Sequence, residues 1–214
     1  KVGDIQLITF DRGLFGADSL VIYIEGDGRV ARTRTRLSKD PTPRNPVGLK
    51  LALADPSRSV LYIARPCQYL DEEQLATCSP RYWSLSRYAE EVVAATDQVI
   101  NWALETTDRP EMPIGLVGYS GGGTVAALVA ARREDISWLV TIAGNLDHAK
   151  WTQIHDLTPL IDSLNPTDYA AELREIPQLH LVGEEDTNIP LRVTESYIGA
   201  FSHPHEIKIE VVPE

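Results

Sequence analysis

Basic residues and long apolar runs are both scarce in this chain. Its 214 residues include 20 Lys and Arg against 31 Asp and Glu, so the formal net charge is −11. The only basic cluster, Arg29–Arg36, is interpreted as a solvated edge or loop, and no basic run could replace the counterions of a nucleic acid. No apolar segment approaches the roughly 18 residues that a membrane span requires. The composition therefore argues against a nucleic-acid binder and a transmembrane protein, and the acidic charge argues against strongly anionic substrates.

Cysteine is also scarce, with only Cys67 and Cys78 in the loop-like stretch "RPCQYLDEEQLATCSPRYW". Two thiols this close in a polar segment favour a disulfide, and with it an extracytoplasmic location: periplasmic, secreted or lipid-anchored. The alternative is two reduced cysteines in a cytosolic protein. The start at Lys1 without methionine suggests a processed N-terminus, which leaves room for a lipid anchor on a missing leader.

Metal and nucleotide motifs are missing as well. No cluster of histidine and carboxylate residues has metal-ligand spacing, and "GYSGGG" lacks the lysine of a phosphate-binding loop. We therefore expect neither a metal nor a cofactor.

Apolar runs alternate with helical patterns along most of the chain. The runs at 20–24, 59–64, 112–119, 136–144, 177–186 and 205–214 read as strands, and most are continuous, as in strands covered on both faces. Between these strands, apolar residues recur at helical spacing in 45–55, 86–107, 122–133 and 190–201. This alternation predicts an α/β fold: a doubly wound, mainly parallel sheet with helices on both faces, in one domain over residues 1–214. "ITFDRG" is expected to be an antiparallel edge strand, 29–45 a surface loop, and about 145–175 a small lid segment.

The stretch "GLVGYSGGGTVAALVAA" places Ser120 between glycines where a strand becomes a helix. Gly118 and Gly122 leave room for a sharp turn that would push the Ser120 hydroxyl above the sheet. The helix that starts near Gly121 would point its free N–H groups at the same place, where a developing oxyanion would be stabilised. The pattern indicates a nucleophilic serine; the alternative is a glycine-rich turn with an incidental serine.

A second glycine-rich loop, Glu25-Gly26-Asp27-Gly28, follows the strand "LVIYI". With this loop and the turn around Ser120, the chain resembles the α/β-hydrolases from Leu20 onward. The resemblance implies an oxyanion hole formed by the backbone N–H groups of Gly121 and Asp27. In that family a histidine usually stands where this chain has Glu25, so the contacts that support the loop must differ. The segments "RPCQY", "YIEGDG" and "NLDH…W…SLNP" are also similar to bacterial secreted or lipoprotein hydrolases of unassigned substrate.

The acid of the triad is expected in "LVGEEDTNIP", where Asp186 matches the family position and Glu184 and Glu185 are alternatives. Its role would be to orient an imidazole. The competing interpretation is that Asp186 caps the helix that begins near Pro190.

The histidine that the resemblance requires is missing from its usual place after the last strand, because the sequence stops at Glu214. His203 and His205 precede that strand and are expected at the wrong edge of the sheet, while His180 lies inside a strand. We expect the catalytic histidine in chain beyond Glu214. Within these residues His148 is the fallback, and His155 is a weaker candidate.

The predicted function is that of a serine hydrolase that cleaves a carboxylic ester or related acyl bond through an acyl-enzyme. The partner would be a small-molecule or lipid ester, and Tyr119, Asn145 and Trp151 are candidates for lining its pocket. The alternative is a catalytically inactive binding protein on the same fold. For this chain, loss of the histidine would mean little or no activity.

Overall fold

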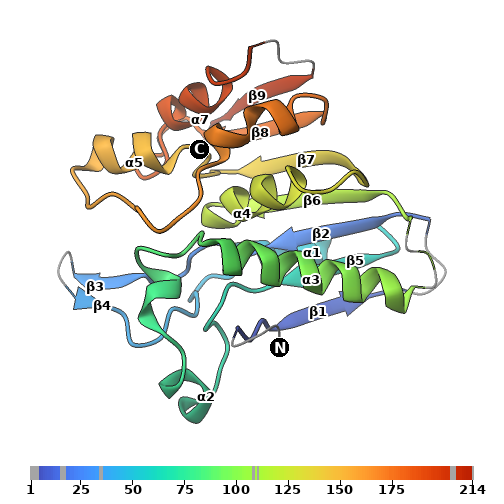
Figure 1. Cartoon of the computed structure of the whole chain (residues 1–214), viewed down its shortest axis with the longest axis horizontal. Helices are drawn as coiled ribbons and strands as arrows, with labels where there is room; N and C mark the ends of the chain where they lie inside the picture. Colours follow the sequence, from blue (N-terminus) through green and yellow to red (C-terminus); the bar gives the residue numbers. More distant parts are fainter. Residues whose placement is uncertain are drawn as a thin grey trace.

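The computed structural model describes residues 5–14, 18–33, 36–107, 109, 111–202 and 206–213. Within these residues a seven-stranded sheet has the order β1-β5-β2-β6-β7-β8-β9 (Figure 1). Its strands are β1 (Thr9–Arg12), β2 (Leu20–Ile24), β5 (Val60–Ile63), β6 (Ile114–Tyr119), β7 (Ile136–Ile142), β8 (Gln178–Gly183) and β9 (Ile207–Val212). β1 pairs antiparallel with β5, and the other pairs are parallel. The predicted fold class is confirmed, including the antiparallel edge strand.

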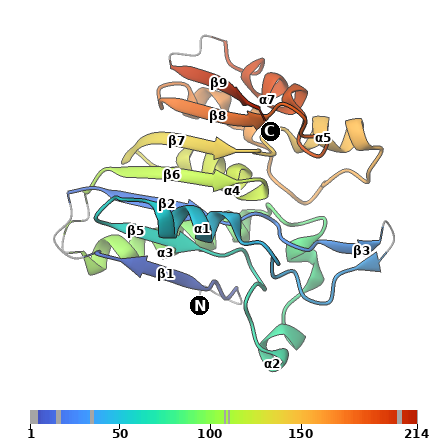
Figure 2. The same cartoon turned by 180° about the vertical axis from the view of Figure 1, so that it is seen from behind.

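Helices cover both faces of this sheet (Figures 1 and 2). α3 (Glu90–Thr106) and α4 (Gly121–Ala130) pack side by side on one face, and α1 (Val47–Ala54) lies on the other. All ten residues of α4 are buried, because small glycine and alanine side chains let the helix lie close to β6 and β7. α7 (Leu191–Ile198) packs against β8. The main core lies between the sheet and these helices.

The long connections carry short elements near the carboxyl ends of the parallel strands. Between β7 and β8 lie α5 (His148–His155), the 3₁₀ helix η2 (Pro166–Tyr169) and α6 (Ala170–Leu173). Between β5 and α3 lie α2 (Glu72–Ala76) and the 3₁₀ helix η1 (Pro80–Trp83). A disulfide joins Cys67 to Cys78 across this second connection, as predicted.

Residues 29–45 differ from the predicted loop. They contain the short hairpin of β3 (Ala31–Thr33) and β4 (Arg36–Leu37), which projects from the body beside the strand ends (Figure 2). The sequence pattern missed it because the paired segments are short and exposed, so no apolar alternation marks them.

No helix in the described residues is both long and apolar enough to cross a bilayer.

Candidate active site

Ser120 occupies a strained turn between β6 and α4. Its backbone angles are φ 51° and ψ −121°, a region that non-glycine residues rarely adopt. The turn is held by hydrogen bonds from Ser120 N to the Ile142 carbonyl at 2.9 Å and from the amides of Gly123 and Asn145 to the Ser120 carbonyl. Such strain persists only where the surroundings over-determine it, and it is typical of functional sites.

Close backbone approach explains the glycines around Ser120. A Cβ at Gly122 would collide with the carbonyl oxygens of Ile24 and Glu25, at the end of β2. A Cβ at Gly118 would collide with the backbone of Gly122 and Gly123. The turn and the loop after β2 are therefore in direct contact.

Glu25 anchors the loop after β2. Its buried carboxylate accepts hydrogen bonds from the backbone N–H groups of Gly26, Gly48 and Leu49 at 2.9 to 3.2 Å, and from the Tyr62 hydroxyl at 3.1 Å. Gly48 and Leu49 lie in the first turn of α1, where the helix dipole favours a negative charge. Glu25 thus connects the loop to α1. The sequence predicted that the contacts supporting this loop would differ from those of the family, because Glu25 stands where a histidine is usual.

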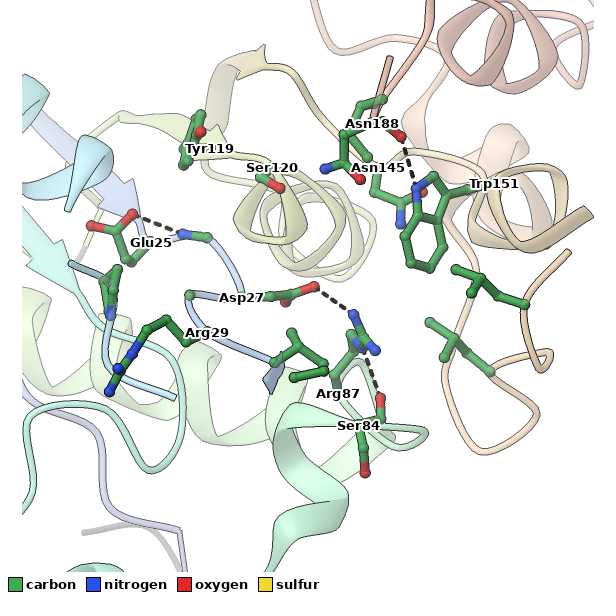
Figure 3. A pocket seen from close by; sticks show the side chains of 18 of the residues that line it. Glu25, Asp27, Arg29, Ser84, Arg87, Tyr119, Ser120, Asn145, Trp151 and Asn188 are labelled. Carbon is green, nitrogen blue, oxygen red and sulfur yellow. Dashed lines mark hydrogen bonds and ion pairs between the residues drawn. The ribbon is translucent and has the colours of Figure 1, made fainter. Parts of the chain in front are cut away.

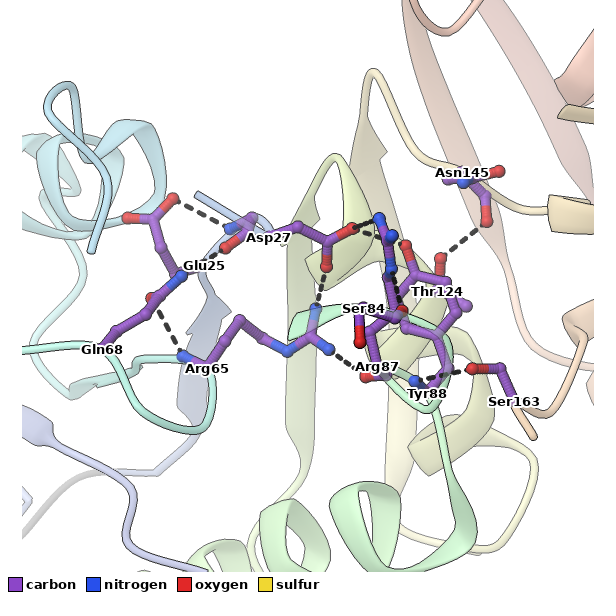
Figure 4. Close-up of polar contacts among 11 residues, drawn as sticks. Glu25, Asp27, Arg65, Gln68, Ser84, Arg87, Tyr88, Thr124, Asn145 and Ser163 are labelled. Atoms are coloured by element: carbon purple, nitrogen blue, oxygen red, sulfur yellow. Dashed lines mark hydrogen bonds and ion pairs between the residues drawn. The ribbon is translucent and has the colours of Figure 1, made fainter. Parts of the chain in front are cut away.

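Asp27 lies at the centre of a buried charge cluster (Figure 4). Its carboxylate accepts from Arg65 Nη1 at 2.8 Å, from Arg87 Nη1 at 3.1 Å and from the Tyr88 hydroxyl at 2.8 Å. Burial alone would raise the pKa of Asp27, but the charges of Arg87 and Arg65 and the Tyr88 hydrogen bond outweigh it, so the pKa lies below its usual value. Asp27 is therefore ionised and held by three side chains.

These three partners were not identified from the sequence, although a signal was present. The segment "RPCQY" follows the carboxyl end of β5 directly, where side chains reach the ligand edge of the sheet. Its Arg65 pairs with Asp27, and its Gln68 donates from Nε2 to the Gly26 carbonyl at 2.9 Å. Cys67, between them, has a positive φ of 69° and carries the disulfide.

Asp27 and Gly121, the two residues whose backbone N–H groups are expected to bind an oxyanion, lie in contact with each other, and Gly121 directly follows Ser120. A Cβ at Gly121 would collide with the Asp27 carboxylate, which places the two residues in contact. Neither amide donates to an acceptor in the described part of the chain. Both donors are therefore unused near the serine.

Ser120 opens into a cavity of about 770 Å³ (Figure 3). The cavity lies at the ends of β2, β6, β7 and β8, because residues just after each of these strands line it: Glu25, Asp27, Ser120, Asn145, Asn188 and Ile189. Its apolar wall comes mainly from Leu37, Leu85, Trp151, Leu157 and Leu160. Ligands of parallel α/β sheets bind at this edge.

Tyr119, Asn145 and Trp151 all line this cavity, next to Ser120 or across from it (Figure 3). The Trp151 indole donates to the Asn188 carbonyl at 2.9 Å and so is held against the loop after β8. Asn145 is 3% exposed, and its Oδ1 is buried without a partner among the described residues. An unsatisfied amide here is a group that a substrate could satisfy.

Asp186 is half-buried in the loop after β8. Its Oδ1 accepts hydrogen bonds from the backbone N–H groups of Asn188 and Ile189, both at 2.8 Å. The pKa of Tyr119 is raised mainly by its burial and in addition by the negative charge of Asp186. Asp186 therefore lies on the Tyr119 side of the site, while Glu184 and Glu185 are exposed. The two hydrogen bonds to Asp186 hold the loop that precedes α7. The N-cap residue of α7 is Pro190, and no side chain makes a capping hydrogen bond there.

No histidine of the described residues lines the cavity. His148 lies in a neighbouring cavity, its Nε2 donates to the Leu164 carbonyl at 3.1 Å, and its Nδ1 is buried without a described partner. His155 Nε2 bonds the Asn188 carbonyl at the surface, and His180 is buried in β8. His203 and His205 lie outside the described residues. The structure does not bring the fallback His148 to Ser120.

No group of three or more histidine, cysteine or carboxylate residues with metal-binding geometry occurs in the described residues. The arrangement that remains is a serine in a strained turn, unused amide donors and an acid one loop away.

A family comparison agrees with this arrangement. The family model described as "Serine hydrolase (FSH1)" matches residues 52–210, well over half of the chain. The chain belongs to this serine hydrolase family. It is therefore a member of the α/β-hydrolase superfamily, and its family is one of hydrolases. A search of curated proteins found no match.

Solved structures show the same fold at low sequence identity. A dienelactone hydrolase from Anabaena variabilis is 17% identical with a TM-score of 0.62, over 100% of this chain and 83% of that one. An esterase from Pyrococcus furiosus is 15% identical with a TM-score of 0.62, over 98% and 77%. An acylaminoacyl peptidase from Pyrococcus horikoshii is 13% identical with a TM-score of 0.69, over 100% of this chain and 36% of that one. These likenesses establish the fold.

Proposed function

We propose that this hydrolase cleaves a carboxylic ester or related acyl bond through an acyl-enzyme on Ser120. The Ser120 hydroxyl attacks the carbonyl carbon, and the backbone N–H groups of Asp27 and Gly121 stabilise the oxyanion. The leaving alcohol departs with the proton that the serine lost, and water then hydrolyses the acyl-enzyme. The partner is a small-molecule or lipid ester.

The observation that carries the proposal is the strained turn that holds Ser120 at the cavity, in contact with the loop after β2. A strained backbone at a non-glycine residue is costly, and such strain is concentrated at functional sites. The backbone amides of Asp27 and Gly121, which donate to no described acceptor, support a preorganised site for negative charge.

The general base is proposed to be a histidine in chain that follows β9. β9 runs parallel to β8, its Val212 is paired with Gly183, and its Val212 carbonyl accepts from Glu184 N at 2.9 Å. Polypeptide that leaves β9 therefore emerges beside the loop of Asp186, where a histidine could be oriented by that carboxylate.

A second candidate is a binding protein without catalysis, favoured by the lack of any described histidine in the cavity. The unused amides would then bind a carboxylate or a carbonyl, and Ser120 would form no acyl-enzyme.

Labelling with a fluorophosphonate probe tests the proposal. We expect the protein as its gene encodes it to be labelled at Ser120, as found by peptide mapping, and labelling to disappear in Ser120→Ala. Ser84→Ala is the matched control, because Ser84 lines the same cavity but its hydroxyl bonds the Pro80 carbonyl. The 214-residue chain should react at least about a hundredfold more slowly, because serine without a base is a weak nucleophile.

Two results would contradict parts of this proposal. Equal labelling of the 214-residue chain and of the protein as its gene encodes it would place the base within these residues, with His148 the first to substitute. Failure of both to react would favour the binding protein.

We also propose an extracytoplasmic location, supported by the disulfide between Cys67 and Cys78. A protease added to intact cells or spheroplasts should reach the protein; full protection until lysis would argue for the cytosol.

A further inference from the structure

The cavity around Ser120 is rich in arginine although the chain is acidic overall. Its charged lining residues, among those described, are Glu25, Asp27, Arg29, Arg44 and Arg87. The Glu25 carboxylate is directed at the amides of its own loop and α1, and it is 1% exposed. Arg29 pairs with Asp40, so the positive charge that remains on this wall is that of Arg44 and of the cluster around Arg87.

The cluster below the cavity holds more positive than negative charge. Asp27 is one carboxylate between two guanidinium groups, Arg65 and Arg87, and both ion pairs are largely buried. Arg65 Nε is buried and has no partner among the described residues. An excess cation in a poorly solvated place is costly unless an anion joins it.

Arg87 presents the accessible part of this cluster. Its Nε donates to the Ser84 carbonyl at 2.7 Å and its Nη1 to Asp27, while its Nη2 donates to no described residue. The guanidinium lies 5.8 Å from the centre of the Trp151 ring and borders the cavity (Figure 3). A planar, fixed guanidinium with an open edge suits a carboxylate.

Arg87 is also close to the reacting position. Gly121 touches the Asp27 carboxylate, and that carboxylate binds Arg87, so a single carboxylate separates the guanidinium from the start of α4. Leu85, Leu157 and Leu160 line the same cavity and could cover a short methylene chain. Arg44, exposed and without an ion pair in the described residues, adds positive charge on another part of the wall.

We propose that the substrate is an ester whose acyl chain carries a second, free carboxylate, and that Arg87 binds this carboxylate while Ser120 attacks the ester. This inference rests on the proposed function and names the substrate class of the same site. Arg87 thereby has two roles: it holds Asp27 and it selects an anionic acyl group.

The test compares two substrates that differ only in charge. Monomethyl adipate and methyl adipamate have the same chain length, with a carboxylate in one and a primary amide in the other. With the protein as its gene encodes it, we expect kcat/KM to be about tenfold or more higher for the carboxylate. A ratio at or below one, with clear hydrolysis of the amide compound, overturns the inference and leaves the proposed function standing.

Variants assign the selectivity to Arg87. Arg87→Gln should lower the ratio of the two kcat/KM values to near one, and Arg87→Lys should restore part of it. Because displacement of Asp27 affects both substrates, the ratio separates recognition from a general loss of catalysis. Arg44→Gln should lower the ratio by a few-fold at most; a ratio unchanged in Arg87→Gln would show that Arg87 does not bind the carboxylate.

Equilibrium binding keeps the two proposals distinguishable. Calorimetry with Ser120→Ala should show that monomethyl adipate binds about tenfold or more tightly than methyl adipamate. If hydrolysis is absent but this preference remains, the proposed function fails and the anionic subsite stands. Equal or undetectable binding of both would count against the subsite.

Discussion

At the scale of single residues, Asp27 combines two functions that are usually separate. Its amide is a proposed oxyanion donor, and its carboxylate is the centre of the cluster formed with Arg65, Arg87 and Tyr88. A change to the carboxylate should therefore affect both stability and catalysis.

Asp27→Asn should destabilise the protein by about 3 to 5 kcal/mol, because two largely buried guanidinium groups lose their counter-charge. The measurement is urea denaturation at pH 7. Asp40→Asn is the control, since Asp40 pairs with Arg29 on a more exposed site and should cost no more than about 1 kcal/mol. Equal losses in both variants would mean that the cluster is not a special source of stability.

The pH dependence of the stability that Asp27 provides follows from the direction in which its pKa is shifted. The pKa of Asp27 is lowered in the folded state, so its contribution is present above the usual pKa of a free aspartate and is lost as the pH falls through the folded value. Asp27→Asn should show a smaller loss of stability in that acidic range.

His180 gives a second pH-dependent prediction. Burial in β8 lowers its pKa to about 4 from a usual value of 6.5. Below pH 6.5 the unfolded chain binds a proton that the folded chain does not, so the free energy of unfolding should fall by up to about 1.4 kcal/mol per pH unit from His180 alone, until about pH 4. Denaturation of the wild-type protein and His180→Gln between pH 4 and 8 measures the difference. Parallel curves would show that the pKa of His180 is not lowered in the folded state.

At the scale of elements, the loop after β2 is positioned by its neighbours on three sides. α1 binds it through Glu25, the segment after β5 binds it through Arg65 and Gln68, and the turn before α4 touches it at Gly121 and Gly122. The amide of Asp27 is thus oriented by contacts from three separate elements.

Glu25→Gln tests the contact with α1. One carboxylate oxygen becomes an amide that cannot accept from Leu49 N or the Tyr62 hydroxyl, and we expect a loss of about 1 to 3 kcal/mol together with a lower kcat for ester hydrolysis. Asp71→Asn is the matched control, because Asp71 also caps a helix, the exposed α2, and asparagine is a good N-cap. A stable variant with unchanged kcat would show that the loop is held without Glu25.

At the scale of the whole molecule, charge is distributed unevenly. The total of −11 argues against anionic substrates, but Arg29, Arg44 and Arg87 converge on one cavity. A net charge describes long-range attraction, whereas recognition depends on the groups within reach of the ligand.

The disulfide links the stability of the molecule to its site. Its cysteines are 11 residues apart, so reduction should destabilise the protein by roughly 2 to 3 kcal/mol. It should also lower kcat, because Cys67 lies between Arg65 and Gln68, which hold the loop of Asp27. Urea denaturation and ester hydrolysis with and without a phosphine reductant measure both effects. The double variant Cys67→Ala/Cys78→Ala is the control and should not respond to the reductant.

Local patterns were sufficient to predict much of this protein. Alternating apolar runs predicted a mainly parallel sheet, since a strand buried on both faces must be apolar throughout. The glycines around Ser120 predicted the turn, because backbone crowding there excludes side chains. The disulfide followed from two cysteines in one short polar segment.

Only the tertiary structure revealed the buried cluster of Asp27, Arg65, Arg87 and Tyr88. Asp27 lies 38 residues from Arg65 and 61 from Tyr88 along the chain, and charged residues so far apart give no periodic signal. Their pairing exists because β2 and β5 are neighbours in the sheet and their loops end at the same edge. The order of the strands decided which charges meet, and thus the electrostatic character of the cavity, whereas spacing along the sequence was enough to predict the sharp turn that carries Ser120.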